Sequence, residues 1–281
     1  MTGIEGLEAV TLVCPVCASA FRSWHAGEPG TVRAVRTDFR TEHARVGEGE
    51  AGAGEAAAAG GREAGAEEGP RIGARVVVDG VRYGLAAFTV HRCGRCGYVA
   101  DGDGYRTDVR VRHAVHAALA LAREERGCGA AGEGTLSEGT LSERHGRAAQ
   151  LLEWNGGRAA AVARRYRIAA WCAEDEGDVE GERYFQRLAA WRLEAALRDP
   201  RGVSGRERAR LTFLVGELWR RIGDVRRARR WFAHVRFEVV APAEQAWLFV
   251  LAATQGSGEA VEWIPLRRGT GRVPEGATGG D

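Results

Sequence analysis

The chain has 281 residues, with 40 basic and 38 acidic side chains and a formal net charge of +2. Every basic residue is Arg, and the absence of Lys excludes phosphate-binding loops that need a Lys, Schiff-base enzymes, protein kinases and Ser-x-x-Lys acyl transferases. The many Arg, Ala and Gly residues beside one Asn and one Met are typical of a GC-rich genome, so Arg content alone is weak evidence for a nucleic-acid partner.

No window approaches about 18 uninterrupted apolar residues, so we expect no membrane span. The first 13 residues contain two Glu and no basic side chain, which does not fit the charged start of a secretory signal. We therefore expect a cytoplasmic protein. In that reducing compartment, six Cys favour metal binding or catalysis over disulfides.

Strands are predicted in the first 104 residues, separated by an insertion. Apolar and β-branched runs predict strands over residues 9–13, 20–24, 31–35, 75–78 and 81–91. Asp79-Gly80 is a hairpin-turn signal between two of them. Residues 47–69 are Gly, Ala and Glu apart from Arg62, so they have almost nothing to bury. We predict a disordered insertion over about 41–74.

From Asp108 onward the apolar period changes from 2 to 3.6, which predicts helices. Their expected ranges are 109–126, 142–154, 158–175, 179–198, 204–222, 224–237 and 242–254. Ser204-Gly205-Arg206-Glu207 has the spacing of a capping box. Residues 255–281 are rich in Gly, Pro and charge and predict a disordered tail, in which Trp263-Ile264 is the one apolar pair.

Two Cys-x-x-Cys elements carry the strongest chemical signal. Cys14 and Cys17 form one pair, and Cys93 and Cys96 form the other. Two tight turns of this kind supply the tetrahedral four-sulfur shell that Zn²⁺ prefers, and such a closed shell leaves no coordination position for a substrate. We predict one structural Zn²⁺ on these four residues and no catalytic residue. Redox chemistry and an iron–sulfur centre remain alternatives, because thiolates serve all three.

The sequence evidence for other metal-binding residues is weaker. His91 precedes Cys93 by two residues, but four Cys suffice for the ion, so a surface His is the favoured interpretation. His113 and His116 share a helical face without the carboxylate of a known metal motif. Cys172 is interpreted as a small buried apolar residue, and Cys128 is given no role.

The helical part has features of a tetratricopeptide pattern. Gly216, Trp219, Gly223, Ala228 and Phe232 have the spacing in which a small residue lets two helices approach and aromatic residues fill the space between them. A plain helical bundle is the competing interpretation. The Arg cluster at 226–230 could contact phosphates, although such runs are usually solvated helix faces.

These segments together resemble the bacterial family named domain of unknown function 2225. The resemblance rests on residues 14–17, 32–39, 93–100 and 214–223. It implies a Cys-rich N-terminal part followed by tetratricopeptide-like helices, and it implies no activity. The long insertion and the segment Gly84 to Thr89 depart from the family pattern.

The sequence thus predicts an α+β protein with three parts. Residues 1–104 form a small zinc-ribbon-like β module, 105–254 an α-helical tetratricopeptide-like module, and 255–281 the tail. The expected function is that of a non-enzymatic, zinc-binding cytoplasmic adaptor whose helices engage an unknown protein partner. A zinc-ribbon nucleic-acid binder that uses the Arg-rich helix is the alternative, and a thiol redox sensor is a weaker one.

Overall fold

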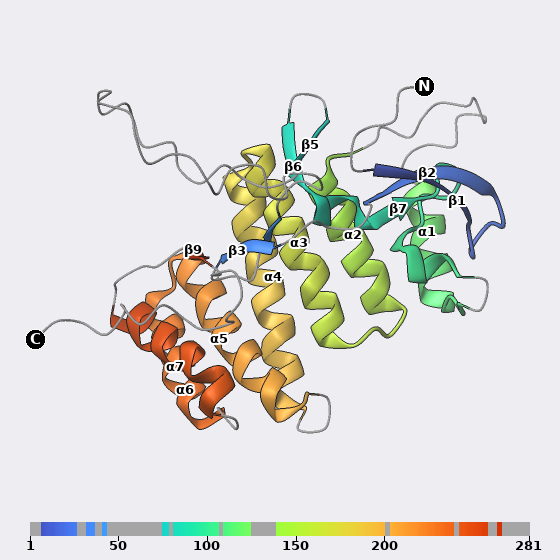
Figure 1. The fold of residues 1–281 in the computed structure, drawn as a ribbon. Helices are drawn as coiled ribbons and strands as arrows, with labels where there is room; N and C mark the ends of the chain where they lie inside the picture. Colours follow the sequence, from blue (N-terminus) through green and yellow to red (C-terminus); the bar gives the residue numbers. More distant parts are fainter. Residues whose placement is uncertain are drawn as a thin grey trace, which may run out of the picture.

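The computed structural model describes residues 7–26, 32–36, 41–43, 75–78, 81–106, 109–124, 139–199, 203–238, 242–257 and 263–265. Within these ranges the protein is mostly helical, with short antiparallel strands beside the helices, so the fold is α+β (Figure 1). The helices are α1 (His113–Glu124), α2 (Leu141–Trp154), α3 (Ala159–Glu176), α4 (Val179–Arg198), α5 (Gly205–Ile222), α6 (Val225–Glu238) and α7 (Pro242–Ser257).

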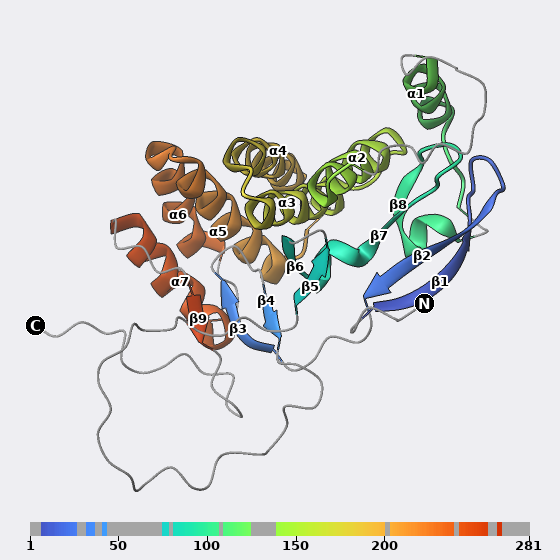
Figure 2. The ribbon, with the colours of Figure 1, turned by 90° about the horizontal axis from the view of Figure 1, so that it is seen from above.

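The strands form small sheets. They are β1 (Leu7–Val13), β2 (Ala20–Ala26), β3 (Val32–Arg36), β4 (Thr41–His43), β5 (Arg75–Val78), β6 (Val81–Gly84), β7 (Val90–Arg92), β8 (Val99–Asp101) and β9 (Trp263–Pro265). The pairs β1–β2, β5–β6 and β7–β8 are antiparallel, and β3 lies between β4 and β9. In Figure 2, strands β3 to β6 lie on one side of the helices, and α4 and α6 lie on the other.

The same three residues make two of the helix turns. Gly177-Asp178-Val179 joins α3 to α4, and Gly223-Asp224-Val225 joins α5 to α6. Both Gly residues end a helix in the left-handed conformation, with φ of 76° and 94°, which Gly adopts without steric cost. Each Asp side chain then accepts a hydrogen bond from a backbone N–H in the first turn of the following helix. These turns set successive helices antiparallel.

Among the residues that the structure describes, three apolar clusters form the core. The largest lies among α2 to α7 and includes Phe213, Leu218 and Phe232. A second contains Cys14, Cys93 and Cys96 together with side chains of α1 and α2. It therefore crosses the predicted boundary at residue 104. A third packs Tyr83 and Phe88 against α2 and α3.

The strand predicted over 81–91 is wrong in its middle. A 3-10 helix, η1 (Leu85–Thr89), separates β6 from β7. Consecutive residues of a strand face opposite sides of the sheet, whereas here Ala87 and Phe88 are both buried. The Thr89 hydroxyl also donates a 2.8 Å hydrogen bond to the Ala86 carbonyl, which stabilises the turn.

The predicted disordered tail needs correction where the structure describes it. Helix α7 extends to Ser257, and Trp263–Pro265 forms β9, which pairs with β3. An edge strand such as β3 presents unpaired backbone groups, and this apolar segment satisfies some of them. The predicted insertion likewise starts with strand β4, while residues 44–74 lie outside the described ranges.

Candidate metal centre

The two Cys-x-x-Cys elements form loops of the same construction. In the first hairpin Val13 pairs with Ala20, and in the second Arg92 pairs with Val99, so each pair of strands encloses a six-residue loop. The N–H of the fifth loop residue donates to the carbonyl of the first Cys, from Ala18 to Cys14 and from Gly97 to Cys93, at 2.9 Å in both loops.

The backbone of both loops turns at the same residue. Ala18 has φ of 56° and Gly97 has φ of 75°, both in the left-handed region. Gly occupies this region readily, whereas an L side chain at such a φ costs roughly 1–2 kcal/mol. The first loop thus maintains the same turn as the second even though Ala stands in place of Gly.

This shared backbone brings four sulfur atoms together. The Sγ atoms of Cys14, Cys17, Cys93 and Cys96 all lie within 4.8 Å of one another. The Cys14–Cys96 separation is 3.4 Å and the Cys17–Cys93 separation is 3.6 Å. In a tetrahedral zinc site with bonds of about 2.3 Å, neighbouring sulfur atoms are about 3.8 Å apart. The arrangement can therefore hold a metal ion.

Three of the four cysteines are buried and Cys17 is partly exposed. Burial raises the pKa of the Cys14 thiol and also that of Cys96. Burial also acts to raise the pKa of Cys17, but hydrogen bonds from the Ser19 hydroxyl and backbone outweigh it and lower that pKa to about 6. The Ser19 Oγ lies 2.9 Å from the Cys17 Sγ and 3.4 Å from the Cys93 Sγ.

Tyr105 packs against both hairpins. Its hydroxyl shares its one proton between two carbonyl oxygens of the second hairpin, that of Tyr98 at 2.7 Å and that of His91 at 3.0 Å. Its ring packs edge-on against Phe21 of the first hairpin and Tyr98 of the second, with both centroid distances 5.3 Å. Tyr105 could not be identified from the sequence, because no local pattern marks it.

The interpretation of His91 as a surface residue is wrong. Its side chain is only 2% exposed, and its Nδ1 lies 3.0 Å from the Ser23 hydroxyl of β2. It therefore joins β7 to β2 and is not part of the four-sulfur cluster. His113 and His116 are exposed on α1. Cys172 is buried in the third apolar cluster, as predicted, and Cys128 lies outside the described residues.

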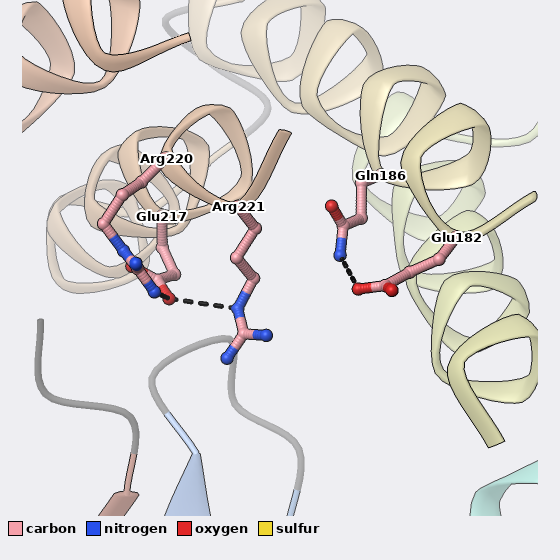
Figure 3. A network of polar contacts seen from close by, with 5 residues as sticks. All are labelled: Glu182, Gln186, Glu217, Arg220 and Arg221. Carbon is pink, nitrogen blue, oxygen red and sulfur yellow. Dashed lines mark hydrogen bonds and ion pairs between the residues drawn. The ribbon is translucent and has the colours of Figure 1, made fainter. Parts of the chain in front are cut away.

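A second polar arrangement lies on the helices (Figure 3). Glu217 of α5 is fully buried, and its carboxylate accepts hydrogen bonds from Arg220 at 2.7 and 2.8 Å and from Arg221 at 3.1 Å. On α4, Gln186 donates a 2.5 Å hydrogen bond to Glu182. The spacing of Glu217, Arg220 and Arg221, at i, i+3 and i+4, can be read from the sequence, but the burial of Glu217 cannot.

A cavity of about 320 Å³ lies where the second hairpin meets α2 and α3. Ala148 and Leu151 line it on the apolar side. On the polar side Arg165 forms an ion pair with Asp101 and donates to the Thr89 hydroxyl at 3.1 Å. These contacts from α3 fix the hairpin of Cys93 and Cys96 against the helices.

In the part of the chain that the structure describes, no helix is both long and apolar enough to cross a membrane. A model of an uncharacterised protein family conserved in bacteria (DUF2225) matches residues 84–245. This range contains the second Cys pair and α1 to α6, whereas the first Cys pair precedes it. Searches of curated proteins and of solved structures found no match.

Proposed function

The chain belongs to this bacterial family of uncharacterised proteins (DUF2225), and we propose that it acts there as a non-enzymatic adaptor held together by one structural Zn²⁺. Cys14, Cys17, Cys93 and Cys96 would hold the ion. The observation that carries the proposal is the convergence of four Sγ atoms within 4.8 Å from two loops of the same construction. Zn²⁺ bound to four Cys is a closed, redox-inactive centre that stabilises a fold.

The hairpin arrangement supports a zinc-ribbon-like module. Each Cys pair lies between two short antiparallel strands, and both hairpins contribute to one small apolar cluster. A core of this size is marginal without further cross-links, and a metal that binds only the folded state supplies its binding free energy as folding free energy. The lack of a coordination position for substrate supports a role without catalysis.

The helices support a tetratricopeptide-like interaction module. The α3–α4 and α5–α6 pairs share the Gly-Asp-Val turn, and each pair packs antiparallel. At the second pair, a Cβ on Gly216 would come within 2.6 Å of the Phe232 ring, so the small residue allows the close approach that the pattern predicts. Stacked helix pairs of this kind commonly present surfaces to other proteins.

Metal analysis tests the zinc centre. Protein purified without chelator should contain about one Zn²⁺ per chain by mass spectrometry of the metal. Cys17→Ser, at the partly exposed ligand, should weaken metal retention, and Cys96→Ser, at a buried ligand, should abolish it. Cys172→Ser is the matched control and should retain the metal. Folded, metal-free protein with a disulfide among the four ligands would instead support the redox alternative.

The adaptor role needs a test on the full chain. The protein has no Lys, so amine-reactive cross-linkers are unsuitable, and a photoreactive amino acid can be placed at exposed positions instead. Arg164 on α3 and Val250 on α7 are exposed helical positions, and Thr11 on β1 is an exposed control. In the native cell we expect one recurrent protein adduct from the helical positions and not from Thr11. Equal labelling from all three positions would contradict a helical interaction module.

A further inference from the structure

The outer face of α6 carries a concentration of Arg side chains. The helix contains five Arg and one Glu, although the net charge of the whole chain is only +2. Arg226, Arg229 and Arg230 are exposed. Among the described residues, no carboxylate forms a salt bridge with any of these three, whereas Arg227 pairs with Asp224. Within the described ranges, this face therefore carries positive charge that no salt bridge neutralises.

The outer face of α4 carries two exposed aromatic rings. Tyr184 is 50% exposed and Trp191 is 46% exposed. They are seven residues apart, so they lie on one face of the helix at a separation of about 10.5 Å along its axis. Arg187, also exposed, lies between them on the same face. Large aromatic side chains this exposed are available for stacking.

The buried Trp219 of α5 contacts both α4 and α6. Its ring packs edge-on against Trp191 with the centroids 6.5 Å apart, and the Arg227 guanidinium lies 4.4 Å from its centroid. The indole N–H of Trp219 donates to Glu194, which therefore already has a partner. Figure 2 shows α4 and α6 on the side of the helices away from β3 to β6. We define the α4–α6 outer surface by Tyr184, Arg187, Trp191, Arg226, Arg229 and Arg230.

We propose that the α4–α6 outer surface binds single-stranded nucleic acid. Proteins that bind single strands without sequence preference combine cationic side chains that track the phosphates with aromatic rings on which bases stack. The surface provides both: exposed Arg on α6 and exposed rings on α4, with Trp219 of α5 in contact with Trp191 of α4 and with Arg227 of α6. Its chemistry recognises phosphates and base faces, so RNA and DNA single strands should bind alike.

The exposed aromatic rings on α4 favour single-stranded nucleic acid over other polyanions. An acidic segment such as poly-glutamate would pair with the Arg side chains but would give Tyr184 and Trp191 nothing to stack on. Duplex DNA keeps its bases stacked internally and offers mainly its backbone. The proposal goes beyond the adaptor role and does not depend on the zinc centre, because none of these residues belongs to the four-sulfur cluster.

Fluorescence anisotropy with labelled single-stranded oligonucleotides tests the proposal on the full-length protein. Binding should weaken with salt, and each phosphate contact contributes about −0.7 to the log–log slope on single strands. Arg229→Gln combined with Arg230→Gln should therefore reduce the magnitude of the slope by about 1.4. Trp191→Leu should weaken binding about tenfold through lost stacking. Arg158→Gln with Arg164→Gln, which removes the same charge from an exposed position just before α3 and one on it, should change neither quantity.

Heparin, a duplex of equal length and a poly-glutamate peptide serve as competitor probes. We expect Trp191→Leu to weaken oligonucleotide binding and to leave heparin binding unchanged. The proposal is overturned if the oligonucleotide does not bind at low salt, or if the α6 variant binds it as tightly as the wild type does. It is also overturned if Trp191→Leu weakens heparin binding as much as it weakens oligonucleotide binding. The same holds if the duplex or poly-glutamate binds more tightly than the single strand. Circular dichroism of each variant checks that the fold is retained.

Discussion

His145 is a titratable residue enclosed by the fold. It is completely buried on α2, and its Nε2 lies 3.0 Å from the Ala87 carbonyl, to which it donates. Within the described residues no hydrogen-bond partner reaches its Nδ1. Burial lowers the pKa of His145 from 6.5 to about 3, because the protonated ring would lose its hydration. The sequence could not indicate this, since the burial arises from η1 packing over α2.

The depressed pKa of His145 predicts acid sensitivity. The unfolded chain binds a proton at His145 below about pH 6.5 and the folded chain only near pH 3, so the free energy of unfolding falls as pH drops between these values. The contribution is fully present above pH 6.5 and is at most about 5 kcal/mol. His145→Gln, which can still donate to the Ala87 carbonyl, should lose less stability between pH 7 and pH 4 in urea titrations. Equal losses in the two proteins would contradict this assignment.

Helices were easier to predict than strands, for reasons visible in single elements. The range predicted for α4, 179–198, agrees with the structure, because Gly177-Asp178 and Pro200 mark its two ends in the sequence. The break at η1 was not predicted, since Ala86-Ala87-Phe88 has no strong local preference and follows its packing. Strand β9 was missed because its pairing partner, β3, is more than 200 residues away in sequence.

The close packing of α5 on α6 predicts a penalty at Gly216. The Cβ of Gly216→Ala would lie 2.6 Å from the ring of Phe232, which is itself only 4% exposed and has little room to move. We expect the free energy of unfolding to fall by about 1–2 kcal/mol. In a Phe232→Leu background the same change should cost less, and urea titrations of the four proteins give this coupling.

Gly256 on α7 is the matched control for this cycle. A Cβ there would meet the nearest heavy atom, the Phe232 Cβ, at 3.9 Å, which is ordinary contact. Gly256→Ala should therefore cause no loss of stability, because Ala is also the better helix former. An equal loss at Gly216 and Gly256 would show that the close approach is not the cause.

At the scale of the whole molecule, the four-sulfur cluster was more predictable than its surroundings. The two Cys pairs could be identified from spacing alone, because tight turns leave few ways to orient two thiols. That His91 and Tyr105 join the two hairpins depends on how the hairpins pack together, which no local pattern encodes. The buried Glu217 was missed for the same reason.

The separation of the apolar clusters predicts a graded response to metal removal. The second apolar cluster contains Cys14, Cys93 and Cys96, whereas the largest cluster, among the helices, contains none of the four cysteines. Chelation should therefore loosen β1, β2, β7 and β8 and leave α3 to α6 folded. Amide hydrogen exchange should show protection lost in the hairpins and retained in α4 and α5. Uniform loss across both regions would indicate a single cooperative unit.

The two halves of the sulfur cluster come from positions far apart in the chain, since Cys17 and Cys93 are 76 positions apart. If the proposed ion is bound, it links Cys17 to Cys93 through metal–sulfur bonds. This link does not depend on the backbone between the two residues being intact. A single proteolytic nick within residues 44–74 would then leave two polypeptides that still migrate as one species under native conditions. A chelator would break the metal–thiolate link. The N-terminal fragment would then be released once its remaining noncovalent contacts with the C-terminal fragment are also lost.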